Sequence, residues 1–164
     1  MENQAIIDDL KIRFGKELLE VKEDSDILTF IVSASVIHEL IGYLKQEESL
    51  QFNFLTDITG IHYPDEVLQL GVIYHLHNFK QNKRVRIKTF VSKNDPKVKS
   101  ITDLFSGANW MERETFDFYG IQFEGHPNLK RILNVEYMDY FPMRKEYPLE
   151  DQSRKDKDDR YFGR

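Results

Sequence analysis

The stretch LGVIYHLHNFKQNKRVRIKTFV, residues 70–91, decides the fold of this chain. Apolar residues alternate with polar or smaller ones in both of its halves. Such a period of two is typical of strands with one buried and one wet face. The polar tetrapeptide Lys80-Gln81-Asn82-Lys83 separates the two runs. The stretch therefore predicts a hairpin of two antiparallel strands, at 70–77 and 84–91.

The segments before this hairpin predict two helices and three shorter strands. Apolar residues at helical spacing indicate a helix over 3–14 that stops at Gly15, and a second helix capped by Ser33 or Ser35. Short alternating or β-branched runs indicate strands at 17–21, 27–32 and 51–54. The polar residues between the first two strands favour a hairpin there as well.

Two further helices are expected after the central hairpin. Pro96 is expected to open one of them, and the second is expected at 109–119, ending at Gly120. The order of these elements predicts an α+β domain over about residues 1–120. In such a domain the helices pack on one face of a mostly antiparallel sheet.

The last part of the chain, residues 121–164, has a different character. Glycines and prolines interrupt it and no long periodic segment appears, yet apolar and aromatic residues persist. A structureless segment of this length is unusual inside a compact domain. We therefore predict a long extended C-terminal arm that packs on another protein. Acids and bases mix without apolar residues at 150–160, which is expected to be exposed unless a partner covers it.

The composition excludes several classes of protein. The chain has 164 residues, a net charge of −5 and no cysteine. The lack of cysteine removes disulfides, thiolate zinc sites, iron–sulfur ligation and cysteine nucleophiles. No apolar run approaches the roughly 20 residues that a membrane-spanning helix needs. The acidic start MENQAIIDDL is unlike a secretory signal, so a soluble cytoplasmic protein is the first expectation.

The densest group of charged and aromatic side chains is WMERETFDFY, residues 110–119. On a helix Arg113 and Asp117 are four residues apart and can form an ion pair. Glu112 and Glu114 point in different directions, so they do not form the carboxylate pair that flanks one bond in a glycosidase. Two interpretations stay open, namely a solvated charged face or a partly buried charge network that binds the arm or a partner.

Two other groups suggest other functions. His75 and His77 share one strand face, but no third ligand lies at a recognisable spacing, so surface or partner-facing histidines are favoured over a metal site. Basic residues gather at 80–99 and would suit nucleic acid, although the acidic chain favours a solvated strand face or an acidic partner. The sequence has no glycine-rich phosphate loop and no nucleophile motif. We therefore expect no catalytic residue, no cofactor-binding residue and no metal ligand.

One run of residues resembles a known family signature. Glu112-Arg113-Glu114 is followed after two residues by Asp117-Phe118-Tyr119, then by His126 and by Lys130-Arg131-Ile132-Leu133. This pattern resembles the signature of the 30 kDa subunit family, lettered C, of proton-translocating NADH-quinone oxidoreductase, respiratory complex I. The later string Arg144-Lys145-Glu146-Tyr147-Pro148-Leu149 is similar to the closing motif of that family, with glutamate where aspartate is usual.

The resemblance implies a structural role in electron transport and proton translocation. Members of that family bind no cofactor and lie in the peripheral arm, where other subunits bind iron–sulfur clusters, FMN, NADH and quinone. As partners the resemblance implies complex I subunits D, B and I, with D as the main one, and no nucleic acid. It also implies a peripheral location at the cytoplasmic side of the cell inner membrane. The positions that it marks as family signature and subunit interface are Glu112, Arg113, Glu114, Asp117, Phe118, Tyr119, His126, Pro127, Lys130, Arg131, Ile132, Leu133, Arg144, Lys145, Tyr147 and Pro148.

Specific roles follow for four basic residues. We expect Arg113, which lies among acidic residues, to anchor the junction between the domain and the arm. We expect Arg131, Arg144 and Lys145 to fix the arm on acidic surfaces of the main partner. An ion pair that is buried by such contacts would cost about 3–5 kcal/mol to break, and an exposed one under about 1 kcal/mol.

The sequence leaves alternatives open. Met138 and Tyr140 stand where the family often has tryptophan and glycine, which concerns the local conformation of the arm. The equivalent subunit of a membrane-bound hydrogenase or related oxidoreductase is the alternative within the same family. A nucleic-acid binding module that uses residues 80–99 is an alternative of another class. A stand-alone hydrolase that uses Glu112 or Glu114 is a third.

Overall fold

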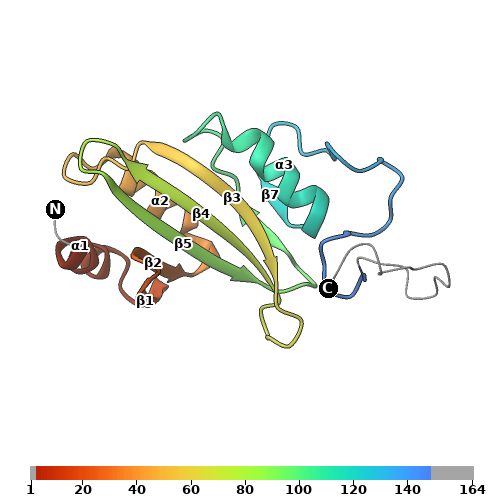
Figure 1. Ribbon diagram of the computed structural model, residues 1–164, viewed down its shortest axis with the longest axis horizontal. Coiled ribbons are helices and arrows are strands. Elements are labelled where there is room, and N and C mark those ends of the chain that lie inside the picture. The colour runs from red at the N-terminus through yellow and green to blue at the C-terminus, as the bar shows by residue number, and fades with distance from the viewer. Residues whose placement is uncertain (1–2, 149–164) are drawn as a thin grey trace, which may run out of the picture.

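The computed structural model describes residues 3–148 and contains one large and one small β-sheet (Figure 1). The strands are β1 (Leu18–Asp24), β2 (Ile27–Val32), β3 (Phe54–His62), β4 (Leu70–Asn78), β5 (Lys83–Val91), β6 (Lys97–Lys99) and β7 (Gln122–Glu124). The α-helices are α1 (Asn3–Phe14), α2 (Ile37–Gln46) and α3 (Ala108–Tyr119). The large sheet has the order β1-β2-β5-β4-β3, and β6 pairs with β7 in the small sheet.

The β4–β5 hairpin lies inside the large sheet, as its alternating pattern predicts. Tyr74 on β4 lies opposite Ile87 on β5 in an antiparallel register. β1 and β2 form the second expected hairpin, and β3 adds to β4, both antiparallel. β2 and β5 pair in parallel, with Phe30 opposite Ile87. The predicted fold class, α+β with a mostly antiparallel sheet, is therefore confirmed.

One face of the large sheet carries the core. Phe30, Tyr74 and Ile87 are completely buried there, whereas their sequence neighbours on β4 and β5 are mostly more exposed. Leu40 and Leu44 of α2 are fully buried members of the same apolar cluster. Each apolar side chain of this size contributes about 1.5–3 kcal/mol relative to an exposed one. The alternation within the strands thus fixes the face against which α2 packs.

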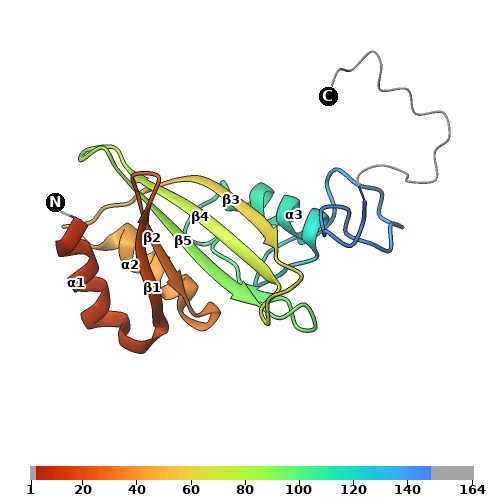
Figure 2. The same cartoon turned by 60° about the horizontal axis from the view of Figure 1, so that its bottom comes forward.

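The other two helices lie on the same side of the sheet (Figure 2). The Phe14 ring of α1 lies 6.1 Å from the Tyr43 ring of α2, edge to face. α3 packs against β3, where a Cβ added at Gly60 would lie 2.3 Å from the Tyr119 ring. Glycine therefore lets the helix approach the strand closely. Among residues 3–148 no helix covers the opposite face of the large sheet.

The prediction of a helix that begins at Pro96 is wrong. Lys97–Lys99 form β6, which pairs in parallel with β7, and turns lead from it to α3. Val98 and Ile101 are buried as the helical spacing suggests, but they are buried by a strand and a turn. The partner strand comes after α3 in the chain, so no local pattern could have shown this pairing. The expected helix at 109–119 is confirmed as α3.

Two local predictions also need correction. The strand expected at 51–54 starts instead at Phe54 and continues as β3, because a register shift between Leu55 and Asp57 interrupts the alternation that marks a strand. The proposed caps of α2 do not act as caps: the hydroxyls of Ser33 and Ser35 lie 2.8 Å from each other instead.

The C-terminal segment begins within the small sheet, since β7 follows α3 almost directly. From residue 125 to residue 148 the described chain forms turns and bends without a helix or strand. The division into a domain and a partner-binding arm stays a prediction, and its part at 149–164 lies outside the described residues. No helix within residues 3–148 is long and apolar enough to cross a membrane.

Candidate functional site

The signature residues of α3 point in different directions. Glu112 and Asp117 are fully buried, whereas Glu114 is exposed. The helix ends at Gly120, whose φ of 74° is a left-handed conformation that glycine adopts without strain. After β7 the chain passes α3 again and contacts it through His126, Arg131 and Arg144 (Figure 1). The buried side chains of α3 therefore face the arm or the core.

The carboxylate of Asp117 is the centre of the contact between α3 and the arm. Its Oδ2 accepts hydrogen bonds of 2.8–3.0 Å from the backbone N–H groups of Ile132, Leu133 and Asn134. Its Oδ1 accepts one of 2.8 Å from Arg131 Nη1. Burial alone would raise the pKa of Asp117, but these hydrogen bonds outweigh burial and hold that pKa well below its usual range. The charged carboxylate thus fixes the turn of the arm.

Arg131 joins three parts of the chain. Its Nη1 also donates to the backbone carbonyl of Asp117 at 2.9 Å, and its Nη2 donates to the carbonyls of Met138 and Tyr140 at 2.8 and 3.0 Å. The guanidinium lies 4.9 Å from the ring centre of Phe141. Only a planar group with several N–H donors can make these contacts at once.

Arg144 fastens the arm to the helix a second time. Its Nε donates to the carbonyl of Tyr119 at 2.7 Å, and its guanidinium lies 4.6 Å from the Phe141 ring centre. A Cβ added at Gly120 would lie 2.5 Å from Phe141 and 2.6 Å from Arg144 Nη2. The residue that ends α3 must therefore be small and must also adopt a left-handed backbone conformation.

The last three carbonyls of α3 bind the arm. A helix leaves its final carbonyls without partners inside the helix. Here each of three consecutive carbonyls accepts a hydrogen bond from the arm: Asp117 from Arg131 Nη1, Phe118 from the Met143 N–H and Tyr119 from Arg144 Nε. The C-terminus of α3 thus serves as the docking point of the arm.

Arg113 holds the first part of the arm through its backbone. Its Nε donates to the carbonyl of Lys130 at 3.1 Å and its Nη2 to that of Arg131 at 3.3 Å, while its guanidinium lies over the Trp110 ring. Arg113 forms no ion pair with Asp117, because the Asp117 carboxylate pairs with Arg131 instead. The pairing expected four residues apart on the helix is therefore wrong, although Arg113 does contact the arm.

His126 makes a further contact between the arm and α3. Its Nδ1 accepts a hydrogen bond from the Asn128 N–H at 3.0 Å, and its Nε2 lies 3.1 Å from the carbonyl oxygen of Asn109. The first contact requires a bare Nδ1, so Nε2 carries the proton and donates to Asn109. This signature histidine therefore links the backbone of the arm to the backbone of α3 by two hydrogen bonds.

Glu112 faces the loop that leads into α3. Its Oε1 accepts from the N–H of Ile101 at 2.8 Å and its Oε2 from the Ser100 hydroxyl at 2.7 Å. Burial raises the pKa of Glu112 to about 7. Of the two interpretations of this helix, a buried polar network holds for Glu112 and Asp117, and a solvated face holds for Glu114.

The end of the described arm reaches the end of β3. The Lys145 N–H donates to His62 Nδ1 at 3.0 Å, and Glu146 pairs with Lys93 at 2.8 Å. Burial lowers the pKa of His62. Sequence reasoning missed His62, because a single histidine at the end of a strand gives no signal of a partner 83 residues later.

Arg131 and Arg144 bind groups of this chain, and their expected contact with another protein stays a prediction. Both guanidinium groups are engaged within this chain, and the Arg131 side chain is only 9% exposed. Lys145 is exposed, and its expected role stays a prediction. The other exposed signature residues are Glu114, Pro127, Lys130, Leu133, Tyr147 and Pro148. The contacts that sequence reasoning missed involve His62, Gly120, Asn134 and Phe141.

The side of the arm that faces solvent is rich in apolar groups. Tyr137 is 88% exposed, and Leu133, Val135 and Met143 are also exposed large hydrophobic residues. Trp110 on α3 is exposed as well. We call these five residues the arm surface. An exposed group of this kind is typical of a protein–protein interface.

Arg86 and His77 of the central hairpin both contact other groups of this chain. Arg86 donates to His75 Nε2 at 2.9 Å and pairs with Asp24 at 3.1 Å. His77 is buried and packs against Phe79 with ring centres 4.4 Å apart, so the expected surface position is wrong for it. Within residues 3–148 no group of three or more histidine or acidic side chains could hold a metal ion.

Comparison with known proteins agrees with the signature. A family profile described as the respiratory-chain NADH dehydrogenase 30 kDa subunit matches residues 30–153. The NADH-quinone oxidoreductase subunit lettered C in Citrifermentans bemidjiense is 37% identical over 153 residues, which cover 93% of this chain and 94% of the relative. The subunit lettered C 2 in Rhizobium etli is 42% identical, with coverage of 84% and 73%. A mitochondrial NADH-ubiquinone oxidoreductase 30.4 kDa subunit of Candida maltosa is 42% identical, and the match spans 44% of that relative's length.

Solved structures show the same fold. A trypsin-resistant fragment of Nqo5 superposes with a TM-score of 0.67 at 28% identity, covering 79% of this chain and 100% of the fragment. A chain of an archaeal membrane-bound sulfane sulfur reductase superposes with a TM-score of 0.72 at 22% identity, covering 90% and 87%, which shows the fold alone. With the family profile matching most of its length, this chain belongs to the family of the 30 kDa subunit of respiratory-chain NADH dehydrogenase.

Proposed function

We propose that this chain is a non-redox structural subunit in the peripheral arm of NADH-quinone oxidoreductase. In that position it supports electron transfer from NADH through iron–sulfur clusters to quinone, coupled to proton translocation, while neighbouring subunits bind FMN and the other cofactors. The observation that carries the proposal is the Asp117–Arg131 contact, which puts two signature residues into the attachment of the arm. Signature residues that attach the arm to the helix are consistent with a role in assembling the complex.

The chemistry of the signature carboxylates supports a role without catalysis. Both oxygens of Asp117 and both oxygens of Glu112 accept hydrogen bonds from neighbouring groups of the chain. A general base or nucleophile must be within reach of a substrate, whereas the side chains of Asp117 and Glu112 are fully buried. These carboxylates are instead used to position backbone.

The arm surface supports assembly with other proteins. It combines Tyr137 and Trp110 with aliphatic side chains, and aromatic residues are enriched at the centres of protein interfaces. Among the expected partners, subunits D, B and I, we propose that D binds this surface and that B and I are further neighbours. Lys145, exposed at the end of the described arm, would contact an acidic group of the same main partner. Through this complex the chain would lie at the cytoplasmic side of the cell inner membrane.

The equivalent subunit of a membrane-bound hydrogenase or related complex remains the second candidate. The fold shared with the sulfane sulfur reductase complex favours it, but at 22% identity, whereas named NADH-quinone oxidoreductase subunits reach 37–42%. The nucleic-acid alternative is weakened by the basic residues themselves, because Arg86, Lys93 and Lys97 are each paired with an acid of this chain.

Affinity purification of the tagged chain from solubilised membranes tests the proposal. We expect subunits D, B and I to co-purify with NADH-quinone oxidoreductase activity. Recovery of hydrogenase subunits would favour the second candidate, and recovery of the chain alone would contradict both. As a matched pair, Leu133→Ser with Tyr137→Ser should reduce co-purification, whereas Ile12→Ser at an equally exposed site on α1 should not.

A further inference from the structure

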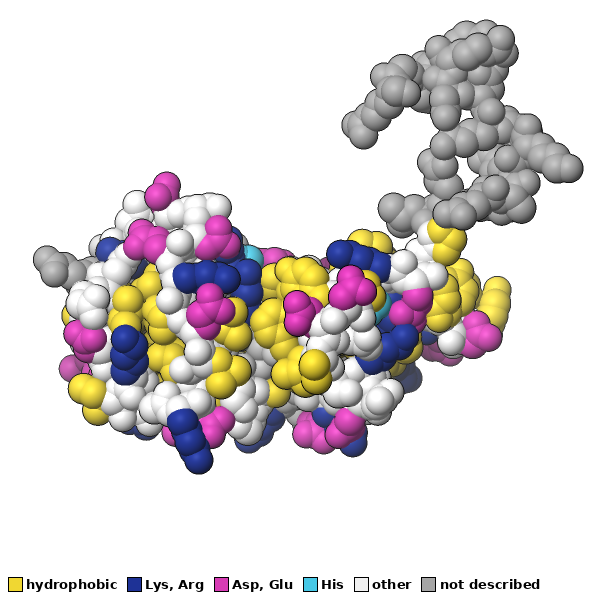
Figure 3. Space-filling model, turned by 90° about the horizontal axis from the view of Figure 1, so that it is seen from below, with side chains coloured by type: hydrophobic (Ala, Val, Ile, Leu, Met, Phe, Trp, Pro, Cys, Tyr) yellow, Lys and Arg dark blue, Asp and Glu magenta, His cyan; other side chains and the backbone are white. Residues whose placement is uncertain are grey.

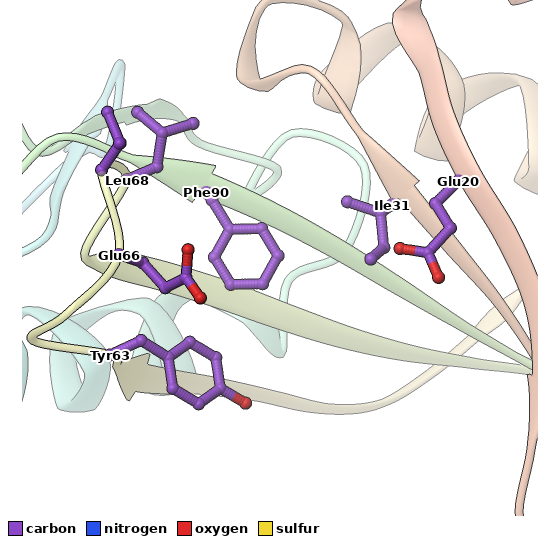
Figure 4. Close-up of a pocket in the computed structure, with 7 residues that line it drawn as sticks. Glu20, Ile31, Tyr63, Glu66, Leu68 and Phe90 are labelled. Carbon is purple, nitrogen blue, oxygen red and sulfur yellow. The ribbon is translucent and has the colours of Figure 1, made fainter.

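The uncovered face of the large sheet holds a groove that the proposed function does not use (Figure 4). Its floor consists of Ile31 from β2, Phe90 from β5 and Leu68 from the loop after β3, and it encloses about 410 Å³. Val67 in the same loop is 91% exposed. Figure 3 shows hydrophobic side chains gathered across the middle of the molecule with acidic ones among them. An apolar hollow beside exposed apolar side chains is suited to bind a ligand.

Two acidic side chains flank this floor. Glu20 comes from β1 and Glu66 from the loop after β3, and Figure 4 shows both carboxylates turned toward the space around Phe90. Tyr63 closes another side, with its ring centre 6.1 Å from that of Phe90. Glu20 also pairs with Lys22 at 3.3 Å, but an exposed pair of this kind contributes little. The groove therefore fits a ligand with an aromatic centre and a positive charge on each side.

A segment of this chain has that pattern. Arg160-Tyr161-Phe162-Gly163-Arg164 places two aromatic residues between two arginines. The family profile ends at residue 153, so the resemblance to the family assigns this segment no role. Its charges are opposite to those of Glu20 and Glu66, and its aromatic centre matches the apolar floor.

The described arm ends beside the groove. Lys145 donates its N–H to His62, and its Nζ lies 5.6 Å from the ring centre of Tyr63, a residue of the groove wall. From Pro148 to Tyr161 an extended chain spans about 40 Å. The five strands of the sheet together span only about 20 Å. The segment can therefore reach any part of the groove.

We propose that residues 160–164 dock in this groove of their own chain. Tyr161 and Phe162 contact the apolar floor, and the two arginines face Glu20 and Glu66. The short connection holds the segment near the groove at an effective concentration of about millimolar, so a weak contact is already populated. In the free subunit this contact covers apolar surface that is otherwise exposed to water.

Disulfide trapping in the full chain tests the contact directly. Because the sequence has no cysteine, a designed pair reports on this contact alone. Val67→Cys with Gly163→Cys leaves both acids, both arginines and both aromatic residues in place. Under mild oxidation we expect an intramolecular disulfide, detected by mass spectrometry and non-reducing electrophoresis. It should form at least tenfold faster than in the same pair carrying Tyr161→Ser and Phe162→Ser.

Three further variants separate docking from mere proximity. Glu20→Lys with Glu66→Lys should slow trapping, and adding Arg160→Glu with Arg164→Glu should restore it. Trapping of Gly163→Cys with Tyr137→Cys, a similarly exposed site outside the groove, should stay slow. Equal rates in the serine control or at position 137 would overturn the proposal. Disulfides that form only between copies, at a rate that rises with protein concentration, would overturn it in favour of a second copy as occupant.

Discussion

Asp117 Oδ1 and Arg131 Nη1 meet at 2.8 Å in a site where the carboxylate is fully buried and the arginine side chain almost so. Each of these two groups also has other hydrogen-bond partners. The carboxylate also accepts backbone N–H groups of the arm, and the guanidinium also donates to backbone carbonyls of the arm. A buried ion pair is favourable only when its remaining donors and acceptors are satisfied in this way. The pair therefore joins helix and arm as one unit.

Replacement of Asp117 by Asn should release the arm from α3. The amide keeps the shape but loses the charge, and its NH₂ group faces N–H donors of Leu133 and Asn134. We expect the free energy of unfolding in urea to fall by about 3–5 kcal/mol, with faster proteolysis at 125–148. Glu114→Gln on the same helix is exposed and should change stability by less than about 0.5 kcal/mol. Similar losses in both variants would contradict the role of this site.

Acid should remove the contribution of Asp117. Its pKa in the folded chain lies well below the unfolded value near 4, so the unfolded state binds the proton first as pH falls. The contribution of this carboxylate is fully present above about pH 4 and is lost progressively below it. The difference in unfolding free energy between the wild type and Asp117→Asn should therefore shrink between pH 6 and pH 3. A difference that is constant over this range would argue against a charged Asp117.

Lysine should not replace Arg131. Its single ammonium can neutralise Asp117, but it cannot also reach the carbonyls of both Met138 and Tyr140. We expect Arg131→Lys to lose hydrogen-exchange protection of the arm nearly as fully as Arg131→Ala. Lys130→Ala next to it is the control, because its side chain is exposed. Full protection in Arg131→Lys would show that charge alone holds the arm.

A methyl group at Gly120 should displace the arm. Gly120→Ala meets both a left-handed φ and close contact with Phe141 and Arg144. Gly125→Ala is a matched control, since its φ of 84° is similar but no atom lies within 4 Å of the added Cβ. Strain alone costs on the order of 1 kcal/mol, so Gly125→Ala should lose about that much. Gly120→Ala should lose about 1–3 kcal/mol more from overpacking, measured by urea denaturation of both variants.

The parts of the fold that depend on neighbours in sequence were predictable. The β4–β5 hairpin follows from alternation and a polar turn, and α3 follows from its spacing and from Gly120. β6 was mistaken for helix because Val98 and Ile101 share a helical spacing while the strand that pairs with β6 lies beyond α3. Local periodicity carries no information about such a distant partner.

The same reason explains the error at the site. Helical spacing offered Arg113 as the partner of Asp117, since the two lie one turn apart. The structure uses Arg131, which the chain brings back only after β7. Signature spacing identified the participating residues, but it does not say whether an arginine binds its own chain or another one. Geometry was needed to show that Arg131 and Arg144 act within this chain.

Glu112 should make the protein less stable as pH rises from about 4.5 to about 7. Burial, assisted by the charge of Asp103, raises its pKa from 4.5 to about 7, so the folded state holds a proton that the unfolded state has released. As pH rises from about 4.5 to about 7, the contribution of this proton to the free energy of unfolding falls by a total on the order of 3 kcal/mol. Above pH 7 the loss is complete. Glu112→Gln keeps an oxygen for the Ile101 N–H and an NH₂ group for the Ser100 hydroxyl, without titrating. Its urea unfolding free energy should therefore fall less than that of the wild type between pH 5 and pH 8. Glu114→Gln should keep the wild-type slope, and parallel slopes in all three proteins would show that Glu112 does not carry this proton.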